Sequence, residues 1–312
     1  MGGDQPADLF AAAVTSGALD LPLPGGGRTR ERWAALRALG EQDLVLARLA
    51  EGHTDALAIL AELGGHPPVP PNSRWGVWAA VPGSLTAVEE AGGWRLTGER
   101  PWCSGAVVCT HALVTASAPD GIRLFAVANP NDPVDGTWPA VGMAASDSRT
   151  VRFTSTPAEA VGKPGDYVGR AGFWHGAIGV AACWHGGAVG VARALLDSDR
   201  TASDPHAAAH LGGVDAALHG AGVALDAAAV VIDAEPGGDA RWLAGRTRAI
   251  VERAASEVLE RVGRALGAGP LCLDATHARR VADLTVYLRQ SHGERDLAVL
   301  GEQVAQSGDP RW

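Results

Sequence analysis

The histidines are the side chains in this sequence best suited to bind a metal or to move a proton. His206 and His210 are four residues apart, which on a helix places both imidazoles on one face, as a zinc site with a third ligand would need. No glutamate lies between them, so the metalloprotease pattern is not met. His175 and His185 each follow a tryptophan, but they are nearly three helical turns apart and cannot share a metal. We predict no metal site and interpret these histidines as packing or surface residues.

Other common catalytic patterns are missing from the sequence. The four cysteines, at positions 103, 109, 183 and 272, form no CxxC pair, which argues against a zinc ribbon or a disulfide framework. The G-x-S-x-G turn of α/β-hydrolases, the Walker loop and the dinucleotide fingerprint do not occur at any predicted strand-to-helix junction. These observations disfavour hydrolase, nucleotide triphosphatase and simple nicotinamide-dependent activities.

Composition restricts the partners and the location. The chain has 312 residues, of which 46% are hydrophobic, and a net charge of -9, which argues against nucleic acid and against an anionic membrane surface. The N-terminus lacks the basic and apolar regions of a signal peptide. The longest apolar stretch, residues 169–196, is interrupted by charged residues and histidines, so we interpret it as a buried helix. We expect a cytoplasmic protein.

The elements that must position any site fall into three zones. Residues 8–63 show helical spacing of leucines, and the proline-rich stretch 66–73 ends that zone. From Trp75 to about Gly162 the period shortens to two, which predicts an antiparallel all-β unit. Its predicted short strands are the runs 75–81, 93–98, 111–117, 122–128 and 149–155. Helical patterns then return in four long segments, at residues 172–198, 206–234, 240–265 and 275–306, the last broken near Ser291 to Glu294.

This order predicts an α+β multidomain fold. The predicted domains are an N-terminal helical domain over residues 1–73, a middle antiparallel β-barrel over 74–163 and a C-terminal four-helix bundle over 164–312. Small residues are abundant in the bundle helices, and they allow the close helix approach that bundles and subunit interfaces need.

Three stretches together resemble the acyl-CoA dehydrogenase family of flavoproteins. Gly93 to Ser117 is similar to the segment of the middle domain that carries a Trp-x-Ser/Thr turn, and Gly172 to Asp197 is similar to the first helix of the C-terminal bundle. Glu260 to Gln290 resembles the helix that ends in a glycine-rich turn together with the helix after it. The resemblance covers roughly residues 8 to 300, and it rests on the combination of the three stretches in this order.

The resemblance implies FAD as cofactor and assigns roles to several residues. The indole of Trp102 would cover the flavin ring, and the Ser104 hydroxyl would reach its N5 or O4, since alternate residues of a strand share a face. Glycines near position 267 would let the backbone approach the adenosine end of the cofactor. The implied cofactor-binding residues are Trp102, Ser104, Gly105, Gly267, Ala268 and Gly269.

The implied reaction oxidises the Cα–Cβ bond of an acyl thioester, and it needs a base. In a common family arrangement a glutamate follows an Arg-Asp pair by eight residues on the last long helix. Counting from Asp283, that position falls on Ser291, so His292 is the implied catalytic base. The resemblance also implies a homodimer or homotetramer that associates through the bundle.

Two alternatives stay open because family motifs are replaced. The Thr-Glu-Pro stretch and the base glutamate are missing, and residues 198–205 read SDRTASDP where a diphosphate-binding arginine stretch is expected. One alternative is a reduced-flavin monooxygenase of the same fold, in which no base glutamate is needed. The other is a flavin-free degenerate partner subunit that forms a hetero-oligomer with an active homologue.

Overall fold

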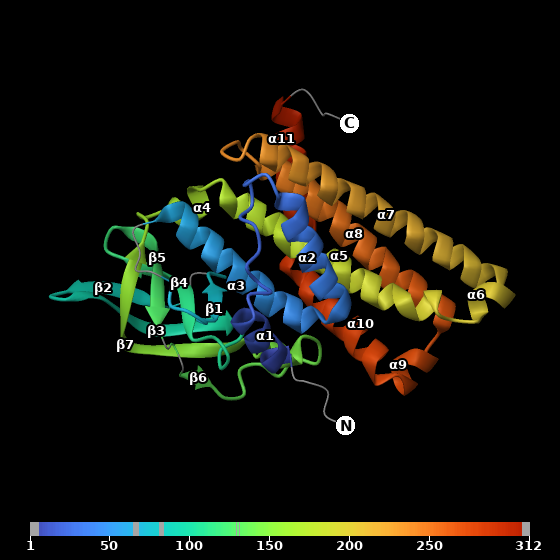
Figure 1. The fold of residues 1–312 in the computed structure, drawn as a ribbon, viewed down its shortest axis with the longest axis horizontal. Coiled ribbons are helices and arrows are strands. Elements are labelled where there is room, and N and C mark those ends of the chain that lie inside the picture. Colours follow the sequence, from blue (N-terminus) through green and yellow to red (C-terminus); the bar gives the residue numbers. More distant parts are fainter. Residues whose placement is uncertain (1–5, 65–68, 81–83, 129, 131, 308–312) are drawn as a thin grey trace. The chain divides into compact units, whose positions relative to one another are not determined.

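The computed structural model describes residues 6–64, 69–80, 84–128, 130 and 132–307 (Figure 1). Contacts divide the chain into two compact units. The first comprises Met1–Leu21, Arg48–Ala140 and Ala144–Phe173, and the second comprises Pro22–Ala47, Val141–Met143 and Trp174–Trp312. The predicted domain boundaries, after residues 73 and 163, follow the changes between helix and strand and stay a prediction.

The first unit is built on one seven-stranded sheet. Its strands are β1 (Trp75–Trp78), β2 (Thr86–Glu90), β3 (Gly93–Cys103), β4 (His111–Ala118), β5 (Gly121–Ala128), β6 (Pro133–Val134) and β7 (Arg149–Val161). The order β1-β4-β2-β3-β7-β5 is closed by a further pairing of β5 with β4, which makes the sheet a barrel. The closing pair β4–β5 is a hairpin of consecutive strands, whereas the pair β3–β7 joins strands that are far apart in sequence.

Most of the barrel is antiparallel, as the period of two predicts. The pairs β2–β3, β3–β7, β4–β5, β5–β7 and β6–β7 are antiparallel, whereas β4 is parallel to β1 and, at a single pair, to β2. On β7, Val151 and Phe153 are buried while Arg152 and Thr154 are exposed, the alternation of a strand with one face on a core. The sequence analysis missed the parallel pairs because the residue pattern within a strand does not show the direction of its neighbour.

Helices and short turns complete the first unit. They are α1 (Pro6–Thr15), the part of α3 (Leu44–Leu63) from Arg48 onward, the 3₁₀ turn η1 (Ala144–Ser146) and α4 (Asp166–Gly169). One core cluster joins Ile59 and Leu60 of α3 to Trp75, Leu113 and Val161 of the barrel. Burial of these side chains removes apolar surface from water and ties α3 to the sheet.

The second unit is helical. It contains α2 (Thr29–Gln42), α5 (Gly172–Leu196) from Trp174, α6 (Arg200–Ser203), α7 (Pro205–Ala234), α8 (Arg241–Leu266), α9 (Gly269–Leu273), α10 (Ala275–Tyr287), η2 (Leu288–Gln290) and α11 (Glu294–Ser307). α7 and α8 run side by side (Figure 1). The four predicted long segments correspond to α5, α7, α8 and the α10–α11 pair, and the predicted break near Ser291 is present.

Small residues and caps explain this packing. A Cβ at Gly186 would overlap the carbonyl oxygen of Arg37, so glycine is what lets α5 approach α2. Asp204 caps α7 by accepting a hydrogen bond from the backbone N–H of His206, and Pro205 occupies the first turn. Local sequence therefore sets where the helices begin, and glycine sets how closely they pack.

Two helices, α5 and α7, are long and apolar enough to cross a membrane by length and composition alone. In the most apolar stretch of α5, 78% of the residues are buried inside the protein, which agrees with its interpretation as a buried helix. The corresponding fraction for α7 is 33%, and Val223, Val230 and Val231 are exposed on it. α7 thus leaves an apolar face uncovered in the single chain.

Candidate functional site

Trp102 lies on a β-bulge near the end of β3. The pairing of β3 with β7 shifts register between Arg100 and Cys103, so Pro101 and Trp102 together face one residue of β7. Pro101 has no N–H to give to the ladder, and a bulge is one of the places where a strand tolerates proline. Trp102 has a φ of 60° and is 55% exposed. The bulge therefore turns a large aromatic side chain outward at some conformational cost.

Ser104 follows directly after β3, and its N–H, its carbonyl and its hydroxyl each form a hydrogen bond. Its N–H donates to the carbonyl oxygen of Trp102 at 3.1 Å, and its carbonyl accepts a hydrogen bond from the Trp78 indole N–H at 3.0 Å. Its hydroxyl lies 2.8 Å from the hydroxyl of Ser148. The alternation argument that predicted a shared face with Trp102 does not apply, because β3 is bulged there and ends at Cys103.

A row of three serine hydroxyls runs inward from Ser104. The Ser148 Oγ lies 2.8 Å from the Oγ of Ser104 and 2.8 Å from the Oγ of Ser146. Ser104 is half-buried, whereas Ser146 and Ser148 are only 1% and 5% exposed. We call Ser104, Ser148 and Ser146 the serine row. Sequence reasoning missed two of its members, which lie more than forty residues beyond Ser104.

Gly105 holds the start of the loop that follows Trp102 and Ser104. It has a φ of 72°, and a Cβ there would lie 2.8 Å from the Cys109 Sγ and 3.0 Å from Leu49. Its N–H donates to the Ser146 carbonyl at 2.7 Å, and the next N–H, of Ala106, donates to the Asp147 carbonyl at 3.2 Å. The predicted glycine position thus has a structural reason in the protein itself.

Two free cysteines are buried beside this loop. Cys103 and Cys109 are buried, and burial raises the pKa of both thiols, that of Cys109 to about 12. A thiol with a raised pKa carries little thiolate and is a weak nucleophile. Neither thiol is therefore suited to nucleophilic or disulfide chemistry at this position.

The predicted adenosine-binding turn follows α8. Gly267 ends the helix with a φ of 70°, and a Cβ on Gly267 or Gly269 would meet no atom within 4 Å. Nearby, Arg200 Nη1 donates to the carbonyl of Ala265 at 2.8 Å and so satisfies one carbonyl of the last turn of α8. The turn leaves open space beside its glycines, and Ala268 lies between them at the start of α9.

His292, the predicted base, lies just before α11. Its imidazole is 64% exposed, and Nδ1 lies 3.2 Å from Oδ1 of Asp296. The backbone N–H of His292 donates to Oδ2 of the same carboxylate at 3.0 Å. The contact between His292 and Asp296 joins residues only four positions apart, and the imidazole is largely exposed to solvent.

A buried carboxyl lies on the preceding helix. Asp283 of α10 is 4% exposed and accepts a hydrogen bond from the backbone N–H of Met143 at 2.5 Å. Burial raises its pKa above the ordinary value, while this hydrogen bond acts in the opposite direction. A Cβ at Gly142 would overlap the carbonyl of Ala282, so residues 141–143 lie directly on α10. Asp283 therefore fastens this segment to the helix.

Within the described residues no group of three His, Cys, Asp or Glu side chains could hold a metal. His175 and His185 are each 3% exposed, and burial lowers the pKa of His185, whose Nε2 lies 3.0 Å from the Leu218 carbonyl. These two histidines are part of the core of the second unit.

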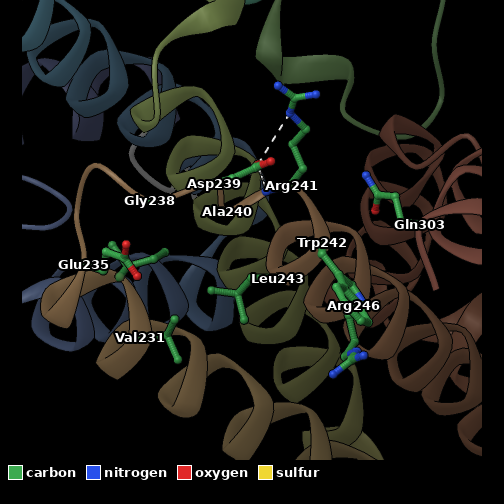
Figure 2. A pocket seen from close by; sticks show the side chains of 11 residues that line it. Val231, Glu235, Gly238, Asp239, Ala240, Arg241, Trp242, Leu243, Arg246 and Gln303 are labelled. Carbon is green, nitrogen blue, oxygen red and sulfur yellow. Dashed lines mark hydrogen bonds and ion pairs between the residues drawn. The ribbon is translucent and has the colours of Figure 1, made fainter. Parts of the chain in front are cut away.

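A pocket of about 510 Å³ lies in the second unit, where the end of α7, the turn into α8 and α11 meet (Figure 2). Arg246 stacks over Trp242 with its guanidinium carbon 4.9 Å from the ring centre, and Arg241 lies 3.5 Å from Asp239. The lining residues are Val231, Ile232, Glu235, Gly238, Asp239, Ala240, Arg241, Trp242, Leu243, Arg246 and Gln303. None of the residues predicted from the sequence to bind the cofactor or act as base lines this pocket.

No protein-family model matches the sequence, and neither does any curated protein. Solved structures do match along almost the whole chain. The dibenzothiophene monooxygenase TdsC from Paenibacillus sp. A11-2 is 19% identical with a TM-score of 0.75, and the match covers 95% of this chain and 94% of that one. XiaF from Streptomyces sp. is 20% identical with a TM-score of 0.76, covering 98% and 89%.

A variant of the steroid acyl-CoA dehydrogenase (ACAD) Tcur3481-Tcur3483 is 19% identical with a TM-score of 0.71, and the match covers 97% of this chain and 89% of that one. At this level of identity the likeness concerns the fold. It agrees with the element order described above, from helices through a barrel to helices. The protein has the acyl-CoA dehydrogenase-like fold, with N-terminal helices, a central β-barrel and a C-terminal helical domain.

Proposed function

We propose that this protein is a flavin-dependent oxidoreductase. The observation that carries the proposal is the exposed indole of Trp102, held on a bulge two residues before Ser104, whose N–H donates to the Trp102 carbonyl. Non-glycine residues held in a left-handed conformation cluster at functional sites, where the surrounding structure holds the strain. Structures with the same fold support a flavin as the occupant: TdsC was solved with FMN and XiaF with FADH2.

The residues present fit a flavin. The flat face of Trp102 would cover the ring, and the Ser104 hydroxyl would bond to the polar edge of the ring. In the second unit, taken by itself, Gly267 and Gly269 leave open space beside Ala268 in which an adenosine could approach the backbone. The bound flavin would supply two-electron transfer, which no side chain of this protein provides.

Among flavin reactions, a reduced-flavin monooxygenase is supported best. Removal of an α-proton from an acyl thioester needs a base shielded from water, and His292 is largely exposed. A reaction between reduced flavin and dioxygen does not need a base at that position. Two similar structures are named a dibenzothiophene monooxygenase and a 3-HSA hydroxylase.

Oxidation of an acyl thioester at Cα–Cβ is the second candidate. It is favoured by the pairing of His292 with Asp296, since a carboxylate that orients an imidazole is a common arrangement for a general base. The similarity to a steroid ACAD points in the same direction. In this case an acyl thioester itself would reduce the bound flavin.

A spectroscopic experiment separates these functions. The full-length protein is titrated with FMN and with FAD, and we expect one or both to bind with a perturbed visible spectrum. Under anaerobic conditions acyl-CoA is then added. A spectrum that stays oxidised supports the monooxygenase, whereas bleaching by acyl-CoA would replace it with the dehydrogenase. A protein that takes up neither flavin would contradict the proposed function and point to a flavin-free partner subunit.

The oxygenase reaction has its own test. Chemically reduced FMN, the protein and a small aromatic probe such as indole, which occupies TdsC together with FMN, are mixed and exposed to isotopically labelled dioxygen. We expect the label to enter the organic product, detected by mass spectrometry. The Trp102→Ala variant serves as the matched control, because it should fold normally and yet bind flavin poorly. Equal labelling by this variant would contradict the assigned site.

We also propose that the protein associates as a homodimer or homotetramer through its helical unit. The proposal is supported by the exposed apolar residues Val223, Val230 and Val231 on α7. Light scattering coupled to size-exclusion chromatography measures the mass directly. A monomer at micromolar concentration would contradict this expectation, and a stable complex with a homologous subunit would favour the hetero-oligomer.

A further inference from the structure

The serine row offers more than a fixed hydroxyl at the ring. Each serine hydroxyl has one hydrogen to donate and can accept two hydrogen bonds. The two contacts of 2.8 Å along the row, from Ser104 to Ser148 and from Ser148 to Ser146, each use one hydrogen. Either oxygen can be the donor in both contacts. The direction of the row is therefore not set by its own geometry.

The hydroxyl hydrogens of the serine row can be arranged in two ways in which Ser148 donates its hydrogen to another serine of the row. When donation runs outward, Ser146 donates to Ser148 and Ser148 donates to Ser104, so the hydrogen of Ser104 is available to an acceptor outside the row. When donation runs inward, Ser104 donates to Ser148, and the Ser104 oxygen presents only lone pairs. Ser148 is 5% exposed, so an arrangement that leaves its hydrogen unbonded would be costly.

These two arrangements match the two redox states of a flavin. N5 of an oxidised flavin is a hydrogen-bond acceptor, whereas N5 of the two-electron reduced flavin carries a hydrogen and donates it. An outward row suits the oxidised ring, and an inward row suits the reduced ring. The change between them needs only rotation of hydroxyl groups about their C–O bonds, and no proton leaves any serine.

We propose that Ser148 is a positioning residue that lets Ser104 switch between donor and acceptor, so that the site binds oxidised and reduced flavin with closely balanced affinity. This inference rests on the proposed flavin function. Without the Ser148 oxygen, Ser104 loses its inner acceptor and inner donor together. The Ser104 hydrogen is then directed toward the ligand, and this favours oxidised over reduced flavin.

The backbone around the row is fixed independently of its hydroxyls. Gly105 N–H donates to the Ser146 carbonyl at 2.7 Å, and Val107 N–H donates to the Asp147 carboxylate at 3.2 Å. Arg149 forms an ion pair with the same carboxylate, and Trp78 holds the Ser104 carbonyl. Removal of one hydroxyl should therefore leave the loop in place, so that a substitution reports on hydrogen bonding.

The test compares Ser148→Ala with wild type in two anaerobic titrations, one with oxidised FMN and one with dithionite-reduced FMN. We expect the ratio of the two dissociation constants to shift about fivefold toward oxidised FMN, the effect of roughly one hydrogen bond. Ser148→Thr keeps a hydroxyl and should restore the ratio to within about twofold of the wild-type ratio. Ser73→Ala, at a buried serine far along the chain from the row, is the control for loss of a buried hydroxyl and should leave the ratio unchanged.

A direct readout complements the titrations. The NMR chemical shift of N5 in isotope-labelled oxidised FMN reports whether that nitrogen accepts a hydrogen bond, and it should differ between wild type and Ser148→Ala. If Ser148→Ala fails to fold, Ser146→Ala interrupts the same row one step further in and should shift the ratio in the same direction.

The outcomes separate this inference from the proposed function. A wild-type protein that binds neither form of FMN overturns both. A wild-type protein that binds FMN, together with a Ser148→Ala variant whose dissociation constants keep the wild-type ratio, overturns the role of Ser148 alone. A shift that Ser148→Thr fails to rescue also overturns it, because the effect would then come from packing.

Discussion

Ser104 and His292, both predicted from the sequence to act in the site, are held in very different ways. The Ser104 loop is fixed by hydrogen bonds from residues far along the chain, including Trp78, Ser146 and Ser148. His292 contacts only a carboxylate four residues away in the hydrogen bonds found for its side chain, and its imidazole is 64% exposed. A preorganised group can support catalysis at lower reorganisation cost. The comparison teaches that tertiary contacts preorganise the Ser104 loop, whereas His292 is held locally, as a surface residue is.

The largest expected effect comes from disturbing the loop at Gly105. Gly105→Ala places a Cβ in a left-handed conformation and 2.8 Å from the Cys109 Sγ. We expect the free energy of unfolding to fall by about 3 kcal/mol, from strain and overpacking together. Gly136→Ala is the matched control, because Gly136 has a φ of 73° but open space around it, and it should cost about 1 kcal/mol. Equal losses in denaturant unfolding would show that the loop is not tightly packed.

Trp102→Ala should separate binding from stability. Because the indole is 55% exposed, we expect the free energy of unfolding to change by less than about 1 kcal/mol. Loss of a flat aromatic wall should weaken FMN binding about tenfold, measured by fluorescence titration. Trp102→Phe keeps an aromatic ring and should retain most of the affinity. Unchanged binding by the alanine variant would remove Trp102 from the site.

Asp283 gives the helical unit a pH dependence of opposite sign to that of an ordinary paired carboxylate. Burial raises its pKa in the folded state above the ordinary value of 3.8, so the folded protein holds this proton longer than the unfolded chain does. The stability it contributes is complete below pH 3.8 and is lost as the pH rises through the folded-state pKa.

The variant Asp283→Asn lacks this proton and keeps an oxygen that can accept from Met143. As the pH rises from 3.8 through the folded-state pKa of Asp283, we expect wild type to lose unfolding free energy relative to Asp283→Asn. Chemical denaturation at several pH values measures the difference, and charges shared by both proteins, such as Asp43 and Arg279, cancel to first order. A difference that stays constant with pH would contradict the raised pKa.

The smallest effect is expected at His292. His292→Ala removes an exposed side chain, so the free energy of unfolding should change by less than about 0.5 kcal/mol. Affinity for FMN and turnover as a monooxygenase should stay within about twofold of wild type. The loss of flavin reduction by acyl-CoA in this variant, with normal reduction in wild type, would instead establish His292 as a base and reverse the comparison with Ser104.

Local residue patterns carried much of the architecture. Five of the strands were predicted from alternation, namely β1, β3, β4, β5 and β7, and the helix break near Ser291 was also predicted. Both signals depend on neighbouring residues only, since period and turn chemistry act over a few positions. The short strands β2 and β6 were missed, because β2 is mostly exposed and β6 has two residues, so neither leaves a clear period.

The sequence by itself determined the order of helices, barrel and helices, and it identified Trp102, Ser104 and Gly105 through a resemblance in local motif. Only the tertiary structure decided how these residues are held. The bulge that turns Trp102 outward depends on the register of β3 against β7, and the contact between Ser104 and Ser148 joins residues 44 positions apart. The pairing of β3 with β7 brings such residues together, and pairing between strands so far apart in sequence depends on the fold of the chain, which no short stretch of sequence records.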